Sequence, residues 1–77
     1  MDEKEILQAI TEHLGLSVED IDRNALLRED LSLGPIELND LLNNLSQKFK
    51  ITFDPSDVDG LKKVEDIIVL VEDNLLE

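Results

Sequence analysis

The feature that most constrains this chain is the material it offers for a hydrophobic core. Its 77 residues include no cysteine, and its only aromatic residues are Phe49 and Phe53. Disulfide bonds and thiolate metal sites are therefore excluded, and leucine, isoleucine and valine must form the core. Short chains that are aliphatic, rich in charge and poor in aromatic residues favour helical bundles. We therefore expect one small all-α domain spanning residues 1–77.

Apolar residues recur at intervals of three and four in three parts of the chain, which is the spacing of one helix face. The first helix is expected over residues 2–14, with Gly15 as its C-terminal cap. The second is expected to begin near Pro35, because proline suits the first helical position. A last helix is expected over residues 63–76. The predicted apolar face of the second helix comprises Ile36, Leu38, Leu41, Leu42, Leu45 and Phe49.

Two connectors join these helices. Residues 16–34 hold scattered hydrophobic residues without sustained periodicity, so this segment is expected to pack over the bundle, with a helical turn near residues 17–21. Residues 50–60 predict a short helix that begins near Pro55 and ends at Gly60. The chain thus predicts three long helices and one short one. The long connector also holds Arg23 and Arg28, which are expected to pair with its own acids, Glu19, Asp20 and Asp22.

The charge of the chain limits its partners. Nineteen acidic residues against seven basic ones give a net charge of −12. This disfavours nucleic acid, which needs clustered lysine and arginine, and it disfavours anionic membranes. A protein with a basic patch is the natural complement, although acidity also serves solubility alone. No apolar stretch approaches the roughly 18 residues of a membrane span. The first residues do not form a signal peptide, so a cytoplasmic location is expected.

Three segments resemble the acyl carrier protein family in their order and spacing. They are LGLSVEDIDRNALLREDL (14–31), IELNDLLNNLSQKFKITFDP (36–55) and LKKVEDIIVLVEDNL (61–75). The resemblance implies a monomeric carrier-type bundle of fatty-acid or polyketide-type metabolism. Members of the family hold acyl chains as thioesters on a 4'-phosphopantetheine arm. The arm is joined to a serine in an Asp-Ser-Leu word at the start of the second helix, where free N–H groups stabilise the phosphate.

The chain departs from the family at this word. In a gapless alignment, Asp-Ser-Leu falls on Gly34, Pro35 and Ile36, and proline has no hydroxyl to carry an arm. In a shifted alignment, SLGPIEL (32–38) makes Ser32 the attachment site for 4'-phosphopantetheine. The shift needs three extra residues between Ser32 and Phe49, and it makes Pro35 about the third residue of the helix. The gapless alignment fits the segments on both sides, so we favour it.

The resemblance also implies a docking surface. The family presents acidic and apolar residues of its second helix to basic patches on acyl-processing or carrier-recognising proteins, and Ile36, Glu37 and Asp40 retain this character. Asn39 and Asn43 stand where the family usually has acidic or apolar residues. Because asparagine is a poor helix former, packing must offset its cost, or these residues face something specific.

Three interpretations remain open. The first is an atypical or degenerate carrier with no arm at Pro35, acting as a protein-docking scaffold or a specialised carrier. The second is an active carrier that uses Ser32. The third, more remote, is a calcium-binding module at DPSDVDG (54–60), although Pro55 falls on the first ligand position of such a loop. Catalysis is not expected, because the only histidine, His13, lies near the end of the first helix and is expected to have no serine or cysteine beside it to activate. No metal ligands are assigned.

Overall fold

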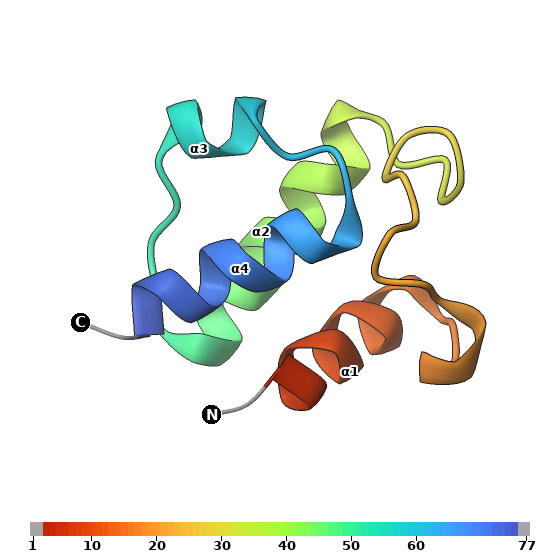
Figure 1. Ribbon diagram of the computed structural model, residues 1–77. Coiled ribbons are helices and arrows are strands. Elements are labelled where there is room, and N and C mark those ends of the chain that lie inside the picture. Colours follow the sequence, from red (N-terminus) through yellow and green to blue (C-terminus); the bar gives the residue numbers. More distant parts are fainter. Residues whose placement is uncertain (1–2, 76–77) are drawn as a thin grey trace.

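The computed structural model describes residues 3–75 and confirms an all-α fold (Figure 1). Its elements, in chain order, are α1 (Glu3–Leu14), the 3₁₀ turn η1 (Val18–Asp20), α2 (Pro35–Phe49), α3 (Pro55–Asp59) and α4 (Val64–Leu75). The three long helices and the short one therefore lie within a residue or two of their expected positions. The expected ends of the first and last helices at Asp2 and Leu76 fall outside the described residues.

Local chemistry sets the ends of the helices. α1 ends at Gly15, whose φ of +74° lies in the left-handed region that glycine enters without strain. The N–H of Leu16 then donates to the carbonyl of Thr11 at 2.9 Å. α2 begins with Pro35 in its first turn, and its C-cap is Lys50, which also adopts a left-handed conformation. The start of α2 and the glycine cap of α1 are confirmed.

The core lies between α1, α2 and α4. α1 packs against both of the other long helices, and each of the three contributes fully buried side chains. The largest of these are Ile6, Ile10, Leu41, Leu45, Val64, Ile67, Ile68 and Val71. The expectation that Ile36 joins the apolar face of α2 is wrong, since 74% of it is exposed. Ile36 lies five positions before Leu41, which turns it about 140° away from the buried face.

α3 is the least anchored helix. None of its five residues is buried, and Val58 is only half-buried against the core. In Figure 1, α3 stands apart from α1 and is joined to α2 and α4 by extended connections. The short helix therefore covers the bundle without contributing a fully buried side chain.

The long connector is tied to the start of α4. The N–H of Leu27 donates to the carbonyl of Lys62 at 2.8 Å, and the N–H of Val64 donates to the carbonyl of Ala25 at 3.1 Å. The guanidinium of Arg23 pairs with Glu3 of α1, and with Glu65 of α4 at 3.2 Å. The expectation that Arg23 pairs within its own connector is therefore wrong. Backbone pairing with residues 62–65 turns this side chain towards acids distant in sequence.

Salt is expected to stabilise the fold. Within residues 3–75 the structure holds three ion pairs, and two of them share Arg23, so most of the excess acids lack a cationic partner in an ion pair. Repulsion among them weakens as ions screen it. The thermal midpoint is expected to rise by a few degrees between low and physiological ionic strength, as measured by circular dichroism. Coincident midpoints would contradict this.

None of the helices described in residues 3–75 is both long enough and apolar enough to span a lipid bilayer.

Candidate functional site

The start of α2 is the first part of the candidate site. Gly34 is the N-cap, with extended backbone, and Pro35 is the first helical residue. The carboxylate of Glu37 folds back over this turn, so that a Cβ added at Gly34 would lie 3.3 Å from its Oε2. Ile36, Glu37 and Asp40 are all exposed. They share one face because residues three and four apart are neighbours on a helix.

Ser32 lies outside the helix. It is exposed, three residues before Pro35, and its φ of +56° places it in the left-handed region. Leu33 beside it is buried, and its N–H donates to the carbonyl of Leu27 at 2.9 Å. Just before Ser32 in the chain, the carboxylate of Asp30 accepts a hydrogen bond from the N–H of Leu26 at 2.8 Å. Ser32 therefore occupies a tight surface turn held in place by its neighbours.

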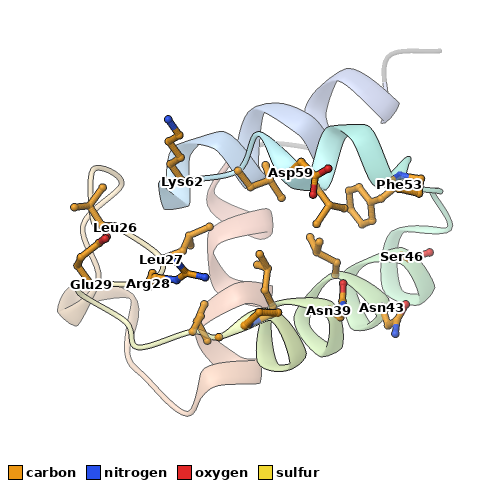
Figure 2. A pocket seen from close by; sticks show the side chains of 18 of the residues that line it. Leu26, Leu27, Arg28, Glu29, Asn39, Asn43, Ser46, Phe53, Asp59 and Lys62 are labelled. Atoms are coloured by element: carbon orange, nitrogen blue, oxygen red, sulfur yellow. The ribbon is translucent and has the colours of Figure 1, made fainter.

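A cavity of about 920 Å³ adjoins the start of α2 (Figure 2). It lies between residues 26–35, α2 and the segment that runs from Thr52 through α3 to Lys62. Its apolar lining comprises Leu26, Leu27, Leu33, Leu38, Leu42, Phe53, Val58 and Leu61. Its polar lining includes Arg28, Glu29, Asn39, Asn43, Asp59 and Lys62. The cavity can therefore hold an apolar group while offering hydrogen-bonding groups beside it.

No pattern in the sequence predicted this cavity. The positions that form it come from three segments whose proximity is set by the fold. One signal was visible, however, since Asn39 and Asn43 are poor helix formers within α2, and both line the cavity. Arg28 also lines it and forms no ion pair with any residue of the 3–75 range, so its expected local pairing is wrong. The turn that contains Arg28 directs its side chain towards the cavity instead of towards Glu19, Asp20 and Asp22.

The other sequence candidates lie away from this site. His13 is exposed in the last turn of α1. Residues 54–60 contain helix α3 and do not form an open loop of the kind that binds calcium. Within residues 3–75 no three His, Cys, Asp or Glu side chains gather closely enough to hold a metal ion.

Comparison with known proteins identifies the family to which the chain is similar. A model of the phosphopantetheine attachment site matches residues 4–71. An acyl carrier protein of Exiguobacterium sp. is 28% identical over 71 residues, covering 92% of this chain and 90% of the relative. One from Nitratidesulfovibrio vulgaris is 30% identical over 70 residues, covering 91% and 92%. The crystal structure of an acyl carrier protein from Thermotoga maritima superposes with a TM-score of 0.77 at 22% identity, covering 95% of this chain and 85% of that one.

The fold and the matched residues define a phosphopantetheine attachment domain of the carrier type. The chain belongs to the acyl carrier protein family. Members of this family can carry 4'-phosphopantetheine, but the first residue of α2 does not fit the group here. Pro35 has no hydroxyl to form a phosphodiester, and the nearest hydroxyl upstream belongs to Ser32, in a left-handed turn outside the helix.

Proposed function

We propose that residues 1–77 form a single carrier-type domain without an arm at Pro35, and that it acts as a protein-docking scaffold or specialised carrier. The setting is fatty-acid or polyketide-type metabolism, and the domain is not itself an enzyme. The observation that carries this proposal is the start of α2 at Pro35. In the gapless alignment, a residue that cannot be esterified thus stands in the first turn.

The position of Ser32 supports the same proposal. A phosphate gains most from a helix N-terminus when it lies within the first turn, because the field of the helix falls off quickly beyond it. Ser32 precedes that turn by three residues and has its own left-handed conformation. The shifted alignment needed Ser32 at the helix start, with Pro35 as about the third residue of the helix.

The expected partner is a protein with a basic patch, such as an acyl-processing or carrier-recognising enzyme. Ile36 offers an exposed apolar contact, and Glu37 and Asp40 on the same face offer negative charge. The net charge of −12 attracts a basic partner over longer distances. We propose that the domain acts as a cytoplasmic monomer.

Intact mass tests the missing arm. The purified protein, Ser32→Ala, Pro35→Ser and the double variant Gly34→Asp/Pro35→Ser are each incubated with coenzyme A and a broad-specificity phosphopantetheinyl transferase. A conventional acyl carrier protein serves as the positive control. No gain is expected on the unaltered chain or on Ser32→Ala. A gain of one phosphopantetheine group is expected on the double variant, because Asp-Ser then precedes Ile36 at the start of α2.

A gain on the unaltered chain that is lost in Ser32→Ala would overturn the proposal. It would establish the second candidate function, an active carrier that uses Ser32. Circular dichroism of each variant shows whether the helices are retained, so that absence of a gain is not mistaken for unfolding.

A further inference from the structure

Residues 52–61, which contain α3, form a flap beside the cavity. Within residues 3–75, the hydrogen bonds made by this flap all join two of its own residues. None of its residues is buried, and only Phe53, Val58 and Leu61 are half-buried against the core. Between its two ends, the flap is therefore held to the bundle by the packing of three side chains and by no hydrogen bond.

Ser46 of α2 anchors the first end of the flap. Its hydroxyl donates a hydrogen bond to the carbonyl of Ile51, the last residue before the flap. Its own carbonyl accepts the N–H groups of Lys50 and Ile51, the latter at 3.1 Å. Ser46 is half-buried, and in Figure 2 it lies near the end of α2 from which the chain continues to α3. Its side chain thus fixes the point at which the flap begins.

A separate anchor holds the second end. The carboxylate of Asp66 accepts the N–H groups of Lys62 and Lys63, and the carbonyl of Lys62 accepts the N–H of Leu27. Lys62 is the first residue after the flap, so this end is fixed to α4 and to the long connector. The flap therefore has one anchor on α2 and another that does not involve α2.

We propose that the hydroxyl of Ser46 is a latch, bonded to Ile51 while the flap is closed and released when the flap opens. A serine inside a helix usually bonds to a carbonyl one turn earlier, whereas this one bonds to a carbonyl five residues later. Phe53 lies two positions after Ile51, so withdrawal of its ring from the core moves the carbonyl that Ser46 holds. The latch concerns the flap alone, whether or not the chain carries an arm.

Such a latch sets how often the flap opens. A hydrogen bond that exists only in the closed state lowers the population of the open state, and its loss raises that population by about two- to tenfold. An open flap leaves α3 without its packing against the core, so the main-chain N–H groups of this short helix become accessible to solvent. Amide hydrogen exchange therefore reports the opening.

The test is amide exchange of the full chain, measured by NMR at a pH where the rate follows the opening equilibrium. In Ser46→Ala, the amides of Asp57, Val58 and Leu61 are expected to exchange about two- to tenfold faster than in the unaltered chain. Ser46→Thr keeps a hydroxyl and is expected to restore the original rates. Asn44→Ala, on the exposed face of α2, gains helix propensity in a similar way and is expected to leave them unchanged.

Amides of α2 and α4 that exchange only through global unfolding distinguish a latch from an ordinary stabilising bond. If the bond of Ser46 persists while the flap opens, Ser46→Ala accelerates these core amides and leaves the flap amides unchanged, which would overturn the proposal. Equal acceleration of the flap amides in Ser46→Thr or Asn44→Ala would also overturn it. Circular dichroism checks that each variant retains its helices. The measurement needs neither coenzyme A nor a partner, so its outcome is independent of the proposed function.

Discussion

Leu45→Ala is expected to lower the free energy of unfolding by about 2–5 kcal/mol. Leu45 is fully buried on α2 among side chains of the core cluster, so its truncation leaves a cavity that the helices cannot close. Domains of ordinary size are stable by only about 5–15 kcal/mol, and a chain of 77 residues lies towards the lower end. The variant is therefore expected to be close to unfolding at 37 °C. Urea titration followed by circular dichroism measures the loss.

Ile36→Ala is the matched control on the same helix. Ile36 is 74% exposed, so its truncation is expected to change the free energy of unfolding by less than about 0.5 kcal/mol. A similar loss in both variants would mean that the described division of α2 into a buried and an exposed face is wrong. The control also separates stability from docking. Ile36→Ala is expected to weaken the binding of a partner that contacts the exposed face of Ile36, Glu37 and Asp40.

Asp66→Ala is expected to lower the free energy of unfolding by about 1–2 kcal/mol, because two backbone N–H groups just before α4 lose their acceptor. Its Oδ2 accepts the N–H groups of Lys62 and Lys63, both at 3.0 Å, where the chain turns into α4. The carbonyl of Lys62 in turn accepts the N–H of Leu27, so loss of the carboxylate also loosens the long connector. Urea titration measures the effect.

Two control variants accompany Asp66→Ala. Asp66→Asn keeps an oxygen acceptor and is expected to retain most of the stability. Asp73→Ala removes the same charge from an exposed position of α4 and is expected to be neutral or slightly stabilising in this acidic chain. Equal stability of Asp66→Ala and Asp73→Ala would contradict the capping role.

The positions of the helices could be predicted because their signals are local. The spacing of apolar residues defined α1, α2 and α4, and Gly15 and Pro35 marked an end and a start through their backbone preferences. Each of these signals depends on residues only a few positions apart. The exposure of Ile36 could also have been predicted in this way, since its angular position on α2 follows from counting residues.

The connector between α1 and α2 could not be predicted in the same way. Its course depends on backbone hydrogen bonds to residues 62–65, which lie about forty positions later in the chain. Arg23 therefore pairs with Glu3 and Glu65 rather than with the acids nearest in sequence. When distant segments hold the backbone in place, the acids nearest in the sequence are often not the ion-pair partners of a basic residue.

Part of the candidate site could be predicted from the sequence. Pro35 could be identified in the expected attachment position from the flanking segments, and the asparagines of α2 were conspicuous as poor helix formers. The cavity that gives them a surface to share was not visible, because its walls come from separate segments. Whether Ser32 carries an arm is a question of chemistry that the mass measurement answers.

The weak anchoring of α3 makes the cavity adjustable. One wall of the cavity belongs to a helix that has no fully buried side chain, while the opposite wall belongs to α2, which is fixed in the core. Amide hydrogens of α3 should therefore exchange with solvent through local opening, well before those of α2 and α4. We therefore expect ligands of different widths to be accommodated by displacement of the short helix, without opening of the bundle beneath it.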